Sequence, residues 1–107
     1  MDMGITPSII LATAASVQDT TGRNGRRNAR LGHKVFVAAI WRNLPATMRA
    51  ELTLDAFKGM LLEWHRAEQL TLARCDLSLA AEQSTQDASE IRAGGRATFH
   101  MIVLPMQ

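Results

Sequence analysis

The chain has 107 residues, of which 47% are apolar, with 12 Lys or Arg against 10 Asp or Glu. This length and composition suit a single globular domain that buries its own core. The single cysteine excludes an intramolecular disulfide and any zinc site built on a cysteine pair, so we expect a reducing, cytoplasmic setting. The apolar run over 8–17 is far shorter than the roughly 20 residues of a membrane span, and we expect no membrane partner.

Positive charge is concentrated in the first half of the chain. Residues 1–50 hold seven basic and two acidic residues, a balance of +5, whereas residues 51–107 hold five and eight, a balance of −3. The segment "GRNGRRNARLGHK", residues 22–34, has five Arg or Lys and no acid. We therefore expect two parts, an apolar segment with a basic arm over 1–27 and a folded domain over 28–107.

Three features are predicted before residue 50. Thr6 followed by Pro7 is a good helix start, which predicts a short helix over 7–17. The glycines of "DTTGRNG", residues 19–25, predict a loop. From 28 to 44, apolar residues recur at intervals of three and four, which predicts a second helix that ends at Pro45.

The most regular helical pattern covers residues 53–68. Thr53 is a natural N-cap, and Asp55 falls in the first turn, where the helix dipole favours a negative charge. Gly59 costs such a helix about 1 kcal/mol relative to Ala, so we expect it to mark close packing. The segment "LPATMRAEL", residues 44–52, could supply another helix before this one.

The apolar period changes to two after residue 68. Alternation over 70–75 and over 96–104 predicts two strands. Gly94 and Gly95 suit a tight hairpin turn, which implies a third strand near 89–92, and residues 76–83 could form one or two helical turns. The predicted class is therefore α+β.

The two stretches "TLDAFKGMLLEWHRAEQLTLARCDL" and "SEIRAGGRATFHMIVL" give a helix that runs into a strand, followed by a glycine-turned hairpin. This order resembles the winged-helix branch of the helix-turn-helix superfamily. The resemblance implies a small domain in which helices precede a two- or three-stranded antiparallel sheet. It also implies DNA binding, as in a transcriptional regulator, with residues 53–68 as the recognition helix and Arg92 and Arg96 at a wing tip beside the phosphates.

The charges of the helix at 53–68 do not suit DNA, because Asp55, Glu63 and Glu68 outnumber Lys58 and Arg66 and phosphate repels carboxylates. The basic segment is the better candidate for phosphate contact, and Asn24 and Asn28 could add hydrogen bonds. The residues that we expect to contact nucleic acid are Arg23, Arg26, Arg27, Arg30, Lys34, Arg92 and Arg96.

The sequence contains no recognisable group of catalytic residues. Cys75, Asp76, His65 and His100 are the candidates, but no accepted spacing joins them into a nucleophilic or zinc site. Trp41 and Trp64 lie near apolar stripes and are better explained by core packing than by base stacking. We expect no enzyme activity, no cofactor and no metal.

Two functions remain open at this point. The first is a DNA-binding protein, with DNA favoured over RNA, that uses its basic arm. The second is a protein-interaction module or adaptor subunit whose arm pairs with an acidic protein surface. An apolar helix without a clear stripe needs a partner face, so self-association into a homo-oligomer is also expected.

Overall fold

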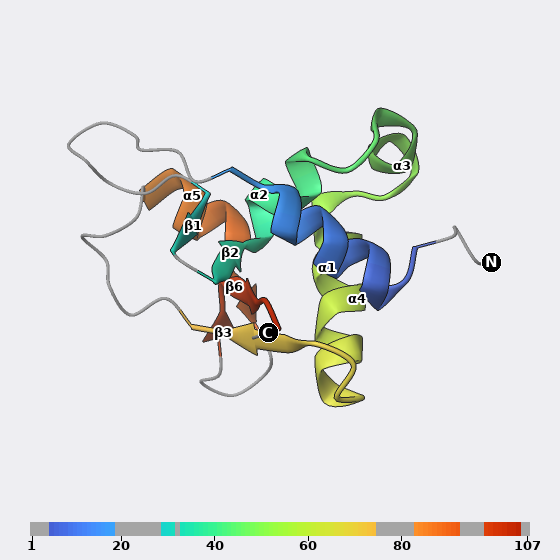
Figure 1. Ribbon diagram of the computed structural model, residues 1–107. Coiled ribbons are helices and arrows are strands. Elements are labelled where there is room, and N and C mark those ends of the chain that lie inside the picture. Colours follow the sequence, from blue (N-terminus) through green and yellow to red (C-terminus); the bar gives the residue numbers. More distant parts are fainter. Residues whose placement is uncertain (1–4, 19–28, 32, 75–82, 93–97, 106–107) are drawn as a thin grey trace.

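The chain combines helices with short antiparallel strands (Figure 1). The computed structural model describes residues 5–18, 29–31, 33–74, 83–92 and 98–105. The helices are α1 (Pro7–Ser16), α2 (Val37–Arg42), α3 (Ala46–Glu51), α4 (Leu54–Arg66) and α5 (Gln83–Ser89). The strands are β1 (Arg30–Leu31), β2 (Lys34–Phe36), β3 (Thr71–Ala73), β4 (Ile91–Arg92), β5 (Thr98–Phe99) and β6 (Met101–Val103). The predicted α+β class is confirmed.

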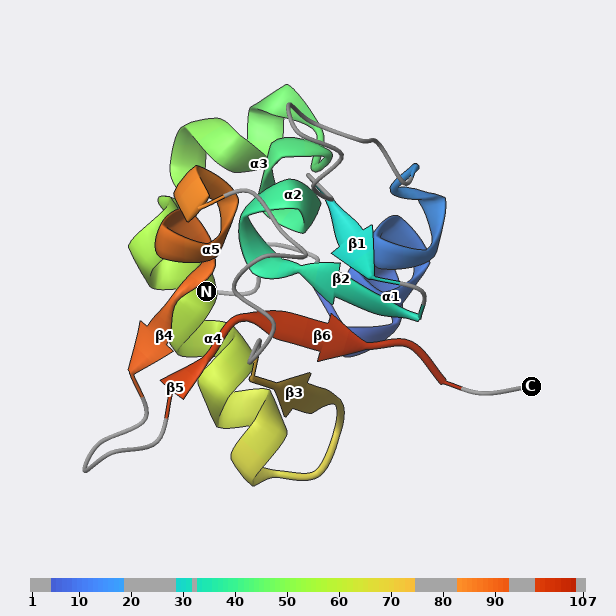
Figure 2. The same ribbon diagram turned by 90° about the vertical axis from the view of Figure 1, so that its left-hand side faces the viewer.

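Strand β6 is central to the larger sheet, whose order is β1-β2-β6-β3 (Figure 2). On one side Val35 of β2 lies opposite Ile102, and on the other side Leu72 of β3 lies opposite the same residue. The end of the chain therefore joins a strand before α2 to the strand that follows α4. The described strands outnumber the two or three that the sequence predicts. Strands β1 and β2 arise from a segment predicted to be helical, and the strand predicted over 96–104 is divided into β5 and β6.

The second sheet is the hairpin of β4 and β5, in which Ile91 lies opposite Phe99. This pairing confirms the predicted hairpin, although its glycines lie outside the described residues. The strand predicted over 96–104 is interrupted at His100, so that β5 pairs with β4 while β6 pairs with β2 and β3.

Helix α1 forms as predicted. Thr6 is its N-cap, with Oγ1 accepting from the Ile9 N–H at 3.3 Å, and Pro7 occupies the first turn. Ile10 and Ala14 are fully buried and belong to the same core as the sheet and the other helices. The described part of the expected segment 1–27 thus packs against the expected domain 28–107, and this apolar helix finds a partner face within its own chain.

The helix predicted over 28–44 is wrong for most of its length. Strands β1 and β2 occupy its first half, and the helical part is α2 alone. Apolar residues at intervals of three and four can also belong to strands. Here the strand β2 pairs with β6, which lies far along the chain. Val35 and Phe36 are β-branched and aromatic residues, and both are fully buried where β2 pairs with β6. Long-range pairing therefore decides the structure of this segment.

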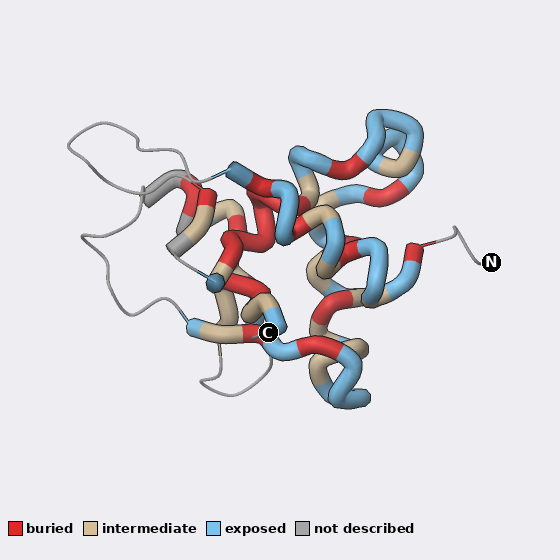
Figure 3. The backbone as a smooth tube through the Cα atoms, viewed as in Figure 1, coloured by how far each residue is buried: buried red, intermediate tan, exposed pale blue. Residues whose placement is uncertain are grey.

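Helix α2 begins inside the core. All residues from 36 to 40 are buried, and Figure 3 shows buried positions gathered where β2 runs into α2. Phe36 has no side-chain cap to offer, so other parts of the chain satisfy the first backbone donors. The Val37 N–H donates to the His100 carbonyl at 3.0 Å, and the Ala38 N–H donates to Ser89 Oγ at 3.0 Å. Helix α5 thereby caps α2.

Helix α5 is a departure from the sequence prediction, which had a strand beginning near Ser89. The helix is polar, "QSTQDAS", and its buried described residues are Thr85 and Ser89. Ser89 is therefore the last residue of a helix, and β4 begins two residues later. The helical turns predicted over 76–83 lie outside the described residues, apart from Gln83, which opens α5.

Helix α4 confirms the prediction for residues 53–68. Thr53 Oγ1 accepts from the Ala56 N–H at 3.1 Å, and Phe57 and Leu61 are fully buried. The helix ends where Glu68 adopts a φ of 61°, a left-handed conformation in which the Gln69 N–H donates to the Trp64 carbonyl at 2.9 Å. The chain then enters β3 within a few residues.

The expected close packing at Gly59 is wrong. Gly59 is exposed, and a Cβ atom built on it meets nothing within 4 Å. We expect Gly59→Ala to stabilise the protein by about 1 kcal/mol, because Ala has the higher helix propensity and less backbone freedom in the unfolded chain. Urea unfolding followed by circular dichroism measures this, and an unchanged or lower midpoint would show that the position is constrained.

Ser89→Ala tests the cap on α2. The substitution leaves the Ala38 N–H buried without an acceptor, which costs about 1–3 kcal/mol. The matched control is Ser16→Ala, because the hydroxyl of Ser16 is exposed and bonds only within its own helix. Equal unfolding free energies for the two variants would contradict the role of Ser89.

Candidate nucleic-acid interface

The expected contact residues do not converge in the described structure. Arg30 lies on β1, Lys34 on β2, and Arg92 on the separate β4–β5 sheet. Arg30 lies opposite Val35, the neighbour of Lys34, so the side chains of Arg30 and Lys34 project to opposite faces of the sheet. The remaining expected residues, Arg23, Arg26, Arg27 and Arg96, lie outside the described residues. Arg30 and Lys34 therefore lie in strands and not in the helix predicted over 28–44.

Arg30 has a structural role. Its Nη1 donates to the Val17 carbonyl at 3.0 Å, and the group is half-buried. Close by, the Phe36 N–H donates to the Ala29 carbonyl at 2.9 Å. These two bonds hold the chain on both sides of residues 19–28, so the arm is an internal segment whose two ends are fixed to the core.

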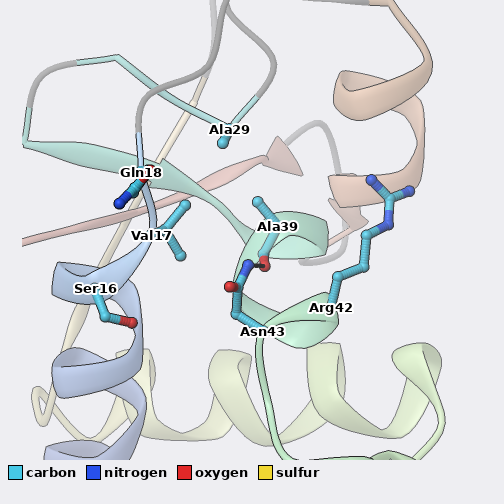
Figure 4. A pocket seen from close by; sticks show the side chains of 7 residues that line it. All are labelled: Ser16, Val17, Gln18, Ala29, Ala39, Arg42 and Asn43. Carbon is cyan, nitrogen blue, oxygen red and sulfur yellow. Dashed lines mark hydrogen bonds between the residues drawn. The ribbon is translucent and has the colours of Figure 1, made fainter.

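A polar cleft of about 460 Å³ lies beside these ends (Figure 4). Gln18 and Ala29, the described residues that flank segment 19–28, both line the cleft. The other lining residues come from the ends of α1 and α2: Ser16, Val17, Ala39, Arg42 and Asn43. The chain therefore leaves the described structure at Gln18 and re-enters it at Ala29, beside the same cleft.

The electrostatics of the cleft are mixed. It lies at the C-terminal ends of α1 and α2, where the helix dipoles are negative, and the Asn43 side-chain amide already donates to the Ala39 carbonyl at 2.8 Å. Arg42 is its charged lining residue, is exposed, and extends away from Ser16 and Val17 in Figure 4. The cleft has one cation in Arg42, but the negative ends of the two helices beside it disfavour a bound anion.

The sequence analysis missed Arg42 and Asn43. Helix packing brings them to Ser16 and Val17, which lie some 25 residues earlier in the chain. No local pattern in the sequence signals this proximity, because it arises from the contact of α1 with α2.

The exposed face of α4 is not basic. Asp55, Glu63 and Arg66 are exposed, while Lys58 is half-buried. The fully exposed charges named here are therefore two carboxylates and one cation, so most of the helix would repel phosphate.

Arg92 is strongly exposed and pairs locally. Its Nε lies 2.9 Å from Glu90 Oε1, with side-chain exposures of 85% and 37%. An exposed pair of this kind contributes little to stability, but it offsets the charge that Arg92 could offer to a phosphate.

Of the residues considered for catalysis, His65 makes structural contacts. His65 Nδ1 accepts from the Leu72 N–H at 3.2 Å, and its ring centroid lies 4.8 Å from that of Phe99. Cys75 and Asp76 lie outside the described residues. Within the described ranges, no three His, Cys, Asp or Glu residues are arranged to hold a metal ion.

Both tryptophans pack against the core, which confirms the prediction made for them. The Trp41 Nε1–H donates to the Leu52 carbonyl at 2.9 Å, and the Arg49 guanidinium lies 6.0 Å from the Trp41 ring centroid. This anchoring leaves Trp41 poorly placed to stack on a base.

Comparison with known proteins gives no relatives. No family model matches the sequence. No curated protein and no solved structure shows significant similarity to the chain. Across the described ranges, no helix is long and apolar enough to cross a membrane.

Arg30→Met tests the hydrogen bond from Arg30 to the Val17 carbonyl, which joins the chain on the two sides of residues 19–28. Removing the guanidinium loses a charge-assisted hydrogen bond to a carbonyl, and we expect a loss of about 1–3 kcal/mol in the free energy of unfolding. Arg42→Met is the matched control, since it removes the same charge from an exposed position at the same cleft. A loss of equal size in both variants would mean that charge, and not the bond to Val17, is responsible.

Proposed function

We propose that this chain is a non-enzymatic domain that binds DNA, in preference to RNA, through its basic segment 22–34. The observation that carries the proposal is the segment itself, which has five Arg or Lys and no acid. The described chain on the two sides of residues 19–28 is joined by the bond from Arg30 to the Val17 carbonyl. Fixed ends reduce the conformational entropy that such a segment would lose on binding.

The order of elements supports the winged-helix resemblance. Helix α4 runs through a short turn into β3, and β6 returns antiparallel beside β3. The chain between β3 and β6 includes α5 and the β4–β5 hairpin, so it is longer than an ordinary wing. The resemblance supports DNA as the partner and a role such as transcriptional regulation.

The proposed contact is with the phosphate backbone and not with base edges. Arginines on one segment can neutralise phosphates or enter a minor groove, whereas α4 offers Asp55 and Glu63 where a recognition helix would meet DNA. Binding of this kind depends strongly on salt and weakly on sequence.

A second candidate function rests on the same face of α4. Because its exposed charges are mixed, this face suits a protein surface better than DNA. The chain would then be an interaction module within a larger assembly, with the basic segment paired to an acidic partner.

The deciding experiment is a titration of labelled duplex DNA, single-stranded DNA and duplex RNA at several salt concentrations. The test variant carries Arg23→Ala, Arg26→Ala and Arg27→Ala, and it leaves Arg30 intact because that side chain holds the fold. The control variant removes the same charge elsewhere, by Arg49→Ala, Lys58→Ala and Arg66→Ala.

We expect duplex DNA to bind most tightly. In the test variant, the slope of log affinity against log salt should decrease by about 2 to 3, since each phosphate contact adds about 0.9. The control should keep the wild-type slope. Absence of DNA binding, or equal slopes in both variants, would refute the proposal and favour the protein-interaction module.

A further inference from the structure

Another cleft, of about 360 Å³, lies where the chain passes from α4 into β3, beside the end of β6. Its lining comes from Leu11 of α1, residues 68–71 and residues 103–105, and we name it the α4–β3 groove. It shares no lining residue with the polar cleft beside the basic segment. Small-molecule sites span about 300–1,000 Å³, so the groove has the size for a small ligand.

The wall of the α4–β3 groove is mainly apolar. Leu70 belongs to the hydrophobic core, and Leu11 and Leu104 pack against that core. Val103 is half-buried beside them and Pro105 is exposed. Because the core holds these side chains in place, the wall offers a fixed surface on which an apolar group can be covered from water.

Glu68 is the charged residue of the lining, and it is exposed. Among the described residues that are not glycine, it alone has a positive φ, of 61°. A side chain raises the energy of this left-handed conformation, which glycine adopts freely. The carboxylate also follows the C-terminal end of α4, where the helix dipole disfavours a negative charge. The backbone and the dipole thus both favour a different residue here.

The end of the helix explains the conformation of Glu68 but not the glutamate. The Glu68 N–H donates to the His65 carbonyl at 3.1 Å, and the Gln69 N–H donates to the Trp64 carbonyl at 2.9 Å. Glycine would make the same backbone bonds without the cost. Within the described residues, the Glu68 carboxylate makes no hydrogen bond or ion pair of its own. A costly residue without a structural contact, at a groove, points to a ligand.

We propose that the α4–β3 groove binds a small organic cation, in which an ammonium or guanidinium group is carried on an apolar stem. The stem lies on the wall of Leu11, Leu70 and Leu104, and the cation pairs with Glu68. An extended peptide suits the place less well, because the Leu72 N–H on the edge of β3 already donates to His65 Nδ1 at 3.2 Å. The proposal goes beyond DNA binding and does not rest on it.

The experiment titrates the full chain with hexylammonium and follows the backbone amides by NMR. Hexanoate is the probe of opposite charge, and propylammonium is the probe with a shorter stem. Glu68→Gln removes the charge at the groove. The matched control is Glu63→Gln, because Glu63 is an exposed carboxylate of α4 that does not line the groove.

We expect hexylammonium to shift the amides of residues 69–71 and 103–104. Propylammonium should bind about 5- to 10-fold more weakly, since each methylene that it lacks is partly covered in an open groove. Glu68→Gln should weaken hexylammonium about 2- to 5-fold, as expected for an exposed ion pair, and Glu63→Gln should not.

Glu68→Gly tests the cost of the glutamate. Glycine should lower the unfolding equilibrium constant about 3- to 10-fold, because it relieves the left-handed backbone, and it should weaken hexylammonium as Glu68→Gln does. This variant would then be more stable and bind less.

Three results would overturn the proposal. The first is that hexylammonium leaves these amides unshifted, or that hexanoate binds there as tightly. The second is an equal loss of affinity in Glu63→Gln and Glu68→Gln. The third is a dimeric mass in light scattering that becomes monomeric in Glu68→Gln, which would show that a second copy of the chain occupies the groove.

Discussion

The fold depends on backbone groups at the start of α2 that must find partners inside the core. Residues 36–40 are buried, and a buried N–H without an acceptor costs free energy comparable to a lost hydrogen bond. The helix supplies no cap of its own, so its donors use His100 before β6 and Ser89 of α5. Segments from the second half of the chain must therefore be in place before the start of α2, in the first half, is satisfied.

The need to satisfy buried backbone groups also positions the chain on the two sides of residues 19–28. The Phe36 N–H, the first donor at this junction, takes the Ala29 carbonyl, and Arg30 then reaches the Val17 carbonyl at the end of α1. The segment with the densest positive charge, residues 22–34, is therefore attached beside this buried junction. This attachment presents the segment from a rigid base, which suits contact with a phosphate backbone better than reading of bases, since base readout needs an element fitted to a groove.

Local signals in the sequence correctly predicted the elements that local interactions stabilise. Thr6 with Pro7, and Thr53 with Asp55, mark helices whose caps are made within a few residues, and both helices form. The hairpin of β4 and β5 was likewise visible from its two glycines and the alternation that follows. The prediction was wrong over 30–36. Apolar spacing there fits a helix, but pairing with a strand some 67 residues later makes the segment a strand.

Other features of the structure were not visible in the sequence, and the reasons are physical. Helix α5 is held by buried polar residues, Thr85 and Ser89, which a search for apolar periodicity cannot detect. The structural role of Arg30 is also invisible in the sequence, because its acceptor is a backbone carbonyl at residue 17 that only the fold brings close. The cleft beside it, with Arg42 and Asn43, depends on helix packing and has no local signature.

Native-state hydrogen exchange at the Val37 and Ala38 amides tests the central role of the α2 start most directly. If His100 and Ser89 hold this start as the structure shows, both amides exchange only through global unfolding, with the denaturant dependence of the whole protein. Rapid exchange of the two amides through a small local opening, while the β6 amides stay protected, would contradict the account.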